Sequence, residues 1–496
     1  MLPAFAFCKN AEPAAILDML AALVEMWGEL PDNIVYLLSQ LFSAQADLPF
    51  RCTDIALAET GVDIRVASAL AMATATSRGL AAVEYFLSFA ETSEAKLASV
   101  GLAGLCAIDA EIWSNARAYR DRVIEVAVNA LQHDHAGHLG YRLLNHLSVA
   151  DSQAQTLVAE AVIAGNHNAQ LETARWVRFM ARQLPSDHVA KLIEALVRGA
   201  VQDSHLRAEV DGTIASLTYN AQTSPLGLMG IDCIGRFFTE RVLDESFSQS
   251  YNLIVADNDR FSQTVSRWLL MADISLPALR SLLAHSQTFP NKLVADVSAF
   301  SATGELERVR AVRRLIGLCY NGAAIANFLY SLASNATTAH WALHAFEDVA
   351  NNFLRIEYPA ETRNFFAARR SSAPARSKLR RVIVEALKLM KQWDEVLRAL
   401  PRLKELRPRQ EKMLTLRLAT QKRNRGINKE ARRKSVFASL ATPVHIKQGR
   451  AVIARMWDGT STITPLTSHS VEFEVPNSEV ADPLLGHLLR HRYLSD

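Results

Sequence analysis

The densest group of possible metal ligands is the stretch His-Asp-His-Ala-Gly-His at residues 133–138. Imidazole nitrogens and carboxylate oxygens are both competent ligands for zinc and similar ions. His135 and His138 stand three residues apart, a spacing that puts both on one face of a helix, and His133 is the third candidate ligand. The alternative is a polar turn between helices, with Asp134 capping the next helix. Because a structural metal site needs four ligands in defined geometry, the stretch is more typical of the turn.

The carboxylates elsewhere in the sequence are more typical of structural roles than of metal binding or catalysis. Asp257-Asn258-Asp259 resembles the opening of a calcium loop but lacks its central glycine and final glutamate, so we predict a capping turn. Glu472 and Glu474 share one face of a predicted strand, with no partner residues that would complete a nuclease site. No P-loop, GxGxxG, GxSxG or HExxH motif occurs. We therefore expect no catalytic residue and no cofactor, and an enzyme with an unrecognised metal site is the second alternative.

The strongest functional signal is a series of three basic clusters between residues 376 and 434. Guanidinium and ammonium groups neutralise phosphates and release counterions, which gives affinity without sequence preference. Few aromatic residues interrupt the clusters, so contact with the backbone of a duplex or a folded RNA fits better than base stacking. The candidate nucleic-acid-binding residues are Arg376, Lys378, Arg380, Arg381, Arg402, Lys404, Arg407, Arg409, Lys422, Arg423, Arg425, Lys429, Arg432, Arg433 and Lys434.

Charge is distributed unevenly along a chain whose formal net charge is only +3. Residues 369–455 hold 25 Lys and Arg against 6 Asp and Glu, a net charge of +19, and the remainder carries −16. Such asymmetry points to an anionic partner of the basic segment. That partner is a nucleic acid, an acidic protein, or the acidic body of the chain itself; a membrane surface is the least favoured.

The composition limits the class of protein. Half of the 496 residues are apolar, enough for a sizeable core. The five cysteines are scattered and form no CxxC pair, which predicts buried free thiols in a reducing compartment. We find no signal peptide and expect no membrane span, so the predicted location is cytoplasmic. Arginine outnumbers lysine and alanine is abundant, a bias typical of a GC-rich bacterial genome.

Helical periodicity dominates residues 11–366. In residues 14–30 the apolar positions recur every three or four residues, and Pro31-Asp32 ends the helix. Helix starts are predicted at Thr92-Ser93-Glu94, at Asp151-Ser152 and at Pro185-Ser186-Asp187. Starts recur about every 15–20 residues, so a pair of helices takes about 35–40 residues. In this pattern the first two thirds resemble a HEAT- or armadillo-like α-solenoid, by pattern only, and an irregular helical domain is the alternative.

The C-terminal third departs from this pattern. We predict an amphipathic helix at 379–400, a basic stretch at 407–434, a β-rich cap at 440–478 and a short helix at 483–490. The predicted domains are a helical-repeat body (1–367), a basic helical segment (368–439) and a β-rich region with a terminal helix (440–496). The predicted function is a non-catalytic scaffold or adaptor subunit of a bacterial multi-protein system with protein partners. The first alternative is a nucleic-acid-binding subunit that contacts phosphates through residues 376–434.

Overall fold

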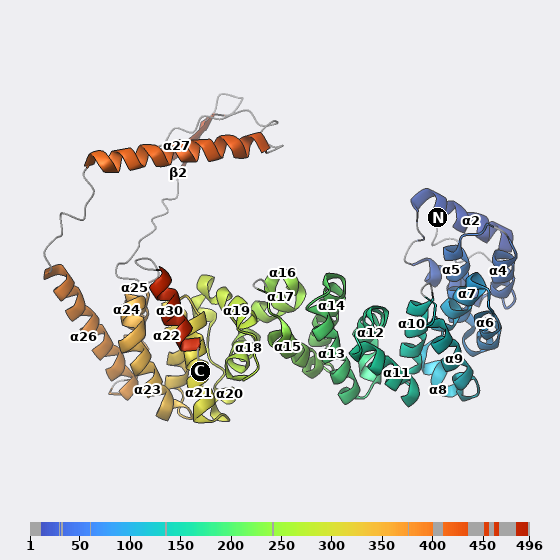
Figure 1. The fold of residues 1–496 in the computed structure, drawn as a ribbon, viewed down its shortest axis with the longest axis horizontal. Helices are drawn as coiled ribbons and strands as arrows, with labels where there is room; N and C mark the ends of the chain where they lie inside the picture. The colour runs from blue at the N-terminus through green and yellow to red at the C-terminus, as the bar shows by residue number, and fades with distance from the viewer. Residues whose placement is uncertain are drawn as a thin grey trace. The chain divides into compact units, whose positions relative to one another are not determined.

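The structure is a computed structural model that describes residues 11–28, 30, 33–59, 61–133, 136–240, 243–374, 376–399, 410–434, 451–455, 461–465 and 483–494. It is mainly α-helical, as the sequence predicts (Figure 1). The chain divides into two compact units. The first comprises Met1–Phe346 with Leu488–Asp496, and the second comprises Glu347–His487.

The first unit begins with α2 (Pro13–Trp27), α3 (Ile34–Ser43), α4 (Leu48–Ala58), α5 (Ile64–Arg78), η1 (Gly79–Ala82), α6 (Val83–Ala90), α7 (Ala95–Cys106), α8 (Ala110–Asn115), α9 (Arg117–Ala130), α10 (Gly137–Leu147), α11 (Ser152–Ile163), α12 (His167–Met180) and η2 (Ala181–Gln183). It continues with α13 (Ser186–Ala200), α14 (Ser204–Tyr219), α15 (Ser224–Phe237), α16 (Leu243–Ser246), α17 (Ser248–Ala256), α18 (Asn258–Leu270), α19 (Leu276–Thr288), η3 (Pro290–Lys292), α20 (Val297–Ser301), α21 (Glu305–Leu318), α22 (Gly322–Ser334) and α23 (Ala339–Val349), the last of which crosses into the second unit.

Helices of the first unit contact both the next helix and the next but one. One layer runs through α3, α5, α7, α10, α12 and α14, each packed on the one before it. On its other side α11, α13 and α15 form a second layer. A contact pattern of this kind buries each helix between its neighbours and needs no contacts that are distant in the sequence. The core is therefore a continuous apolar strip between the two layers.

Helix starts in the first unit are fixed by short polar side chains. Asp151 accepts hydrogen bonds from the backbone N–H groups of Gln153 and Ala154, and so begins α11. Asp257 does the same for Asp259 and Arg260 at the start of α18, which confirms the predicted capping turn. A cap of this kind satisfies N–H groups that have no partner within the helix. Side-chain caps recur at Asp63, Asp109, Asp151, Asn166, Asp203, Asp257, Asp296 and Asn321.

Small residues allow close packing where α6 meets α7. A Cβ atom on Gly101 of α7 would lie 2.5 Å from the backbone nitrogen of Ala90 and 2.7 Å from the carbonyl oxygen of Phe86. Only glycine fits at that distance. The alanine-rich α5 packs on α7 in the same layer. The stretch Ile64–Ala90 is long and apolar enough to cross a membrane, but 56% of its most apolar window is buried in protein, as in a core helix.

The second unit contains η4 (Ala350–Leu354), α24 (Arg355–Glu357), α25 (Pro359–Ser372), α26 (Lys378–Ala399), α27 (Gln410–Lys434), β1 (Ala451–Arg455), β2 (Ser461–Pro465) and the start of α30 (Pro483–Leu494). α26 packs on α25 through a buried stripe that includes Ile383, Ala386 and Met390. An ion pair of 2.8 Å between Arg363 and Asp394 joins the same two helices.

Within the predicted β-rich region the structure describes one antiparallel pair, in which Ala451 stands opposite Pro465 and Arg455 opposite Ser461. The alternating stretch Val471–Val475 lies outside the described residues. Of the five cysteines, Cys52, Cys106, Cys233 and Cys319 are free and buried, and Cys8 lies outside the described residues. Burial raises the pKa of the Cys52 and Cys106 thiols to about 12, so both remain protonated.

Candidate functional sites

The first basic cluster lies at the start of α26. Lys378 and Arg381 are exposed there, and Arg380 is half-buried with its backbone N–H bonded to Ser377 Oγ. Arg376 is exposed and has a backbone φ of 66°, in the left-handed region that residues other than glycine rarely adopt. The N-terminus of a helix is the positive end of its dipole, so these cations add to a positive potential already present.

The second and third clusters differ in what the structure describes. Arg402, Lys404, Arg407 and Arg409 lie outside the described residues. The third cluster belongs to α27, a helix of 25 residues on which every described side chain is exposed. Its exposed cations include Lys422, Arg423, Arg425 and Lys429, and the backbone of Arg432, Arg433 and Lys434 forms its last turn.

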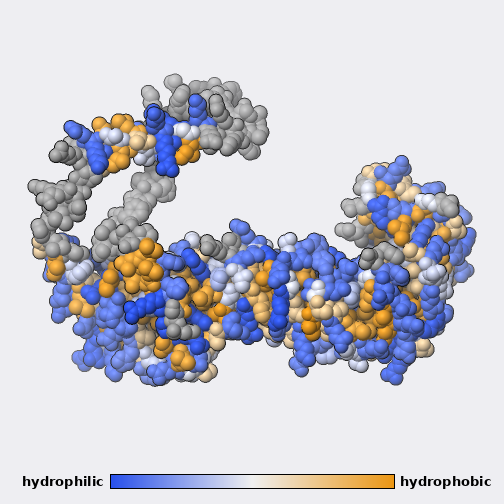
Figure 2. Space-filling view, in the orientation of Figure 1, coloured by the Kyte–Doolittle hydropathy of each residue, from blue (hydrophilic) through white to orange (hydrophobic). Residues whose placement is uncertain are grey.

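α27 presents basic and apolar residues on different sides. Lys422, Arg425 and Lys429 are spaced by three and four residues, so they share one face. Met413, Leu416 and Ile427 lie on the other side, at 38%, 53% and 55% exposure. Figure 2 shows hydrophilic and hydrophobic residues alternating along this helix. Among the described residues, none of these basic side chains has an ion-pair partner.

The histidine-rich stretch leads to two separate cavities. His133 lines a polar cavity of about 690 Å³, whereas His138 lines an apolar one of about 710 Å³. Asp134 and His135 lie outside the described residues. Within the described part of the chain, no three His, Cys, Asp or Glu side chains meet as metal ligands would. His133 and His138 therefore do not share a site, and the structure does not describe His135.

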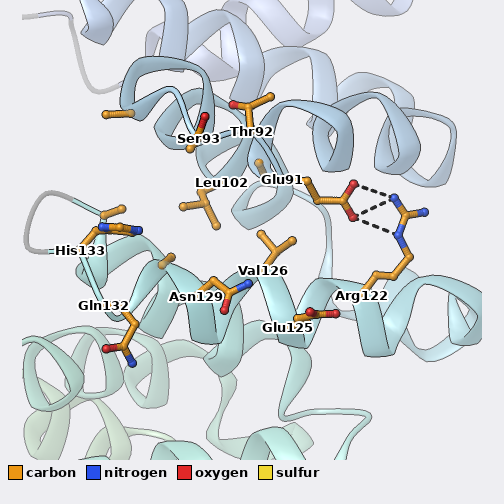
Figure 3. Close-up of a pocket in the computed structure, with 15 residues that line it drawn as sticks. Glu91, Thr92, Ser93, Leu102, Arg122, Glu125, Val126, Asn129, Gln132 and His133 are labelled. Atoms are coloured by element: carbon orange, nitrogen blue, oxygen red, sulfur yellow. Dashed lines mark hydrogen bonds and ion pairs between the residues drawn. The ribbon is translucent and has the colours of Figure 1, made fainter.

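The polar cavity lies between the α6–α7 turn and α9 (Figure 3). Arg122 donates to Glu91 through Nε at 3.0 Å and through Nη2 at 2.8 and 3.0 Å, and its Nη1 donates to both oxygens of Glu84, at 3.1 and 3.2 Å. Glu91 and then Glu84 raise the pKa of the Arg122 guanidinium by accepting these bonds. Asn129 and Gln132 line the same cavity. The charges of Arg122 and its two carboxylates are thus satisfied by one another.

The apolar cavity crosses α3, α5, α7 and α10 of one layer. Among the described residues, its lining contains four basic or imidazole side chains and no Asp or Glu. The lining residues are Leu30, Ile34, Val35, Ile64, Arg65, Ser68, Ala69, Met72, Ala95, Lys96, Ser99, Ala103, His138, Leu139 and Arg142.

A series of ion pairs follows the same layer through α10, α12 and α14. Arg142 Nε donates to Glu172 at 2.9 Å, Arg175 Nη1 donates to the other oxygen of Glu172 at 3.2 Å, and Arg175 Nε donates to Glu209 at 3.0 Å. We call these four residues the charge ladder. Only 6% of the Glu172 side chain is exposed, so its charge depends on both arginines.

His146, on the same helix as Arg142, is a half-buried imidazole whose Nδ1 is shielded from solvent. Its Nδ1 has no hydrogen-bond partner among the described residues. Burial, and then the charge of Arg142, lower its pKa to about 4. The side chain is therefore uncharged at neutral pH.

The C-terminal helix α30 docks on the first unit through Arg490. This side chain is 5% exposed and donates to the carbonyl oxygens of Ile316 and Cys319, at 2.8 and 3.0 Å. Those carbonyls lie at the C-terminal end of α21, where a cation is favoured. The guanidinium carbon lies 4.0 Å from the centroid of the Tyr320 ring. Leu494 packs where Gly317 has no side chain.

The sequence did not single out the charge ladder, Lys96 or Arg490. A usable signal does exist for the ladder. Its partners Arg142 and Glu172 are 30 residues apart, and Arg175 and Glu209 are 34 apart, about the length of one helix pair. A search for opposite charges at that separation would have found both contacts. Arg490 is separated from Ile316 by 174 residues and has no such signal.

Comparison with known proteins gives no identification. No known protein family matches the sequence, and no curated protein matches it. Among solved structures, the chain is similar to an engineered protein studied by the Northeast Structural Genomics Consortium, at 14% identity. The match covers 79% of this chain and 94% of that one, with a TM-score of 0.29, a level of likeness that carries no argument about fold or function.

Proposed function

We propose that this chain is a non-catalytic, HEAT-like helical-repeat scaffold, a cytoplasmic adaptor subunit of a bacterial multi-protein system. The layered packing of the first unit supports this proposal, because each helix contacts the next and the next but one. Repeat proteins of this kind offer long surfaces to partners. The β-rich cap at 440–478 is part of the same proposal.

The observation that carries the proposal is the exposure of α27. A helix of 25 residues with all its described side chains in solvent contributes little to the core, since helices are stabilised mainly by packing of an apolar face. Met413, Leu414, Leu416, Leu418 and Ile427 are each more than a third exposed. Exposed apolar residues among unpaired cations suit a partner with an acidic and partly apolar surface.

A nucleic-acid-binding subunit is the second candidate, and the basic face of α27 favours it. Lys422 and Lys429 are seven residues apart, which places them about 10 Å apart along the helix. Cations along one helix face can neutralise phosphates of a nucleic-acid backbone. The two candidates use the same helix and differ in the partner.

The test measures the binding of three polyanions across a salt series: a DNA duplex, a structured RNA and an acidic polypeptide. The α27 variant carries Lys422→Glu, Arg423→Glu, Arg425→Glu and Lys429→Glu. The matched control reverses Arg51, Arg117, Arg182 and Lys191, four exposed cations of the first unit, so that the net charge changes equally.

Salt-dependent binding of the acidic polypeptide that is lost only in the α27 variant supports the adaptor. A steep salt slope for DNA or RNA, again lost only in the α27 variant, favours the nucleic-acid-binding subunit. Equal loss in both charge-reversed variants contradicts any specific role of α27. If neither the wild type nor either variant binds any of the three polyanions at low salt, both candidate functions are contradicted.

A further inference from the structure

The apolar cavity of the first unit has the size and lining of a small-molecule site. Its volume of about 710 Å³ falls within the range of about 300–1,000 Å³ that holds drug-sized ligands. Ile34, Ala69 and Ala103 are buried and form its apolar base. Val35, Met72 and Leu139 are half-buried, so apolar surface on the cavity walls is only partly covered by protein.

Positive groups line this apolar surface, and no carboxylate of the described residues lines it with them. Lys96 is half-buried and has no ion-pair partner among the described residues. Arg142 donates one hydrogen bond through Nε to Glu172, and its guanidinium makes no further hydrogen bond in the described part of the chain. Arg65 lies beside Asp63, which pairs with it. Lys96 and Arg142 are therefore the groups placed to receive an anion.

The polar cavity provides a contrast within the same unit. It has nearly the same volume, but its arginine is held by two glutamates, and Glu125 adds another carboxylate. An anion in the polar cavity would meet an arginine whose charge is already neutralised by two glutamates. In the apolar cavity Lys96 has no ion-pair partner among the described residues and lies on α7 with the buried Ser99 and Ala103, where partial exclusion of water strengthens its attraction for an anion.

We propose that the apolar cavity binds a small amphipathic anion, a molecule with an aliphatic body and one carboxylate head. The aliphatic body lies along Val35, Met72 and Leu139. The head lies at Lys96 and Arg142, with His138 beside them as a neutral hydrogen-bonding group, since burial lowers its pKa. This site is independent of α27 and of the polyanion partner.

The test uses three probes with the same aliphatic chain and different heads: decanoate, decanol and decyltrimethylammonium. Binding to the full chain is measured by isothermal titration calorimetry below the micelle concentration of each probe. A charge-assisted hydrogen bond contributes roughly tenfold in affinity, so decanoate binds at least about tenfold more tightly than decanol. The cationic probe binds more weakly than decanol.

Variants locate the site. Lys96→Gln removes the charge and brings decanoate to the affinity of decanol. The matched control is Lys191→Gln, which removes a lysine that lines another cavity, of about 420 Å³, and leaves decanoate binding unchanged. Val35→Trp fills the apolar wall and weakens decanoate and decanol together. The α27 charge-reversal variant keeps full decanoate binding, which separates this result from the polyanion experiment.

Three outcomes overturn the proposal. The first is no decanoate binding at submillimolar concentration. The second is equal affinity for decanoate and decanol in the unmodified protein. The third is a preference for decanoate over decanol that survives Lys96→Gln. Because Lys96 is half-buried and has no ion-pair partner among the described residues, we expect this variant to fold, and thermal unfolding checks that it does.

Discussion

The layer formed by α10, α12 and α14 and the helix α27 both carry arginine or lysine residues, but they use these charges differently. In the layer, Arg142 and Arg175 are held by Glu172 and Glu209 of neighbouring helices. On α27, Lys422, Arg423 and Lys429 have no ion-pair partner in the described part of the chain. The same residue types therefore join helices in one region and remain available in the other. The environment, and not the residue type, separates a paired charge from an exposed one.

The largest difference in the effect of a substitution on stability is expected between a glycine of the first unit and a glycine of α27. Gly101→Ala places a Cβ 2.5 Å from the backbone of Ala90 and destabilises the first unit by about 3 kcal/mol. Gly426→Ala in α27 meets nothing within 4 Å and raises the stability of that helix by about 0.5–1 kcal/mol. Chemical denaturation measures the first effect and circular dichroism the second. A loss of stability in Gly426→Ala would mean that α27 packs against the chain.

Arg490 should behave as a structural charge although it is far from its partners in sequence. Arg490→Met leaves the carbonyls of Ile316 and Cys319 without their donor and releases α30 at a cost of about 2 kcal/mol. Hydrogen exchange of the α30 amides measures the release. Arg492→Met, an exposed position in the same helix, is the control. Equal exchange in the two variants would show that Arg490 does not anchor the helix.

The charge ladder should lose stability when its central carboxylate is neutralised. Glu172→Gln leaves Arg142 and Arg175 facing a neutral amide and lowers the free energy of unfolding by about 1–2 kcal/mol. Glu194→Gln removes an exposed ion pair with Arg198 and costs less than about 0.5 kcal/mol. Urea denaturation of both variants decides whether the charge ladder contributes more to the free energy of unfolding than an exposed ion pair does.

His146 makes the stability of the layer depend on pH. Its pKa is about 4 in the folded chain and near 6.5 when unfolded, so the unfolded chain binds the proton more readily between these values. Stability is fully present above pH 6.5 and falls as the pH drops toward 4. Relative to His146→Gln, the wild type should lose about 3 kcal/mol over that range. Parallel pH profiles of the two proteins would mean that His146 is not buried in the folded state.

The sequence predicted the helices that bury an apolar stripe and could not predict what depends on distant contacts. The periodicity of residues 379–400 matches α26 (Lys378–Ala399), and Asp151 and Asp257 cap helices as expected. Residues 407–434 were predicted as a basic stretch of the helical segment 368–439, without helix bounds of their own, because the described side chains of α27 bury no face that would give a helical period. The two cavities arise from residues on several helices, and no local pattern encodes them.

The most direct test of the account measures two properties of one protein, the variant with Lys422, Arg423, Arg425 and Lys429 changed to glutamate. The account predicts a free energy of unfolding within about 0.5 kcal/mol of wild type, because exposed, unpaired charges contribute little to folding. It also predicts at least a tenfold loss of affinity for whichever polyanion the wild type binds. A loss of stability above about 1 kcal/mol with unchanged polyanion affinity would show that α27 docks on its own chain.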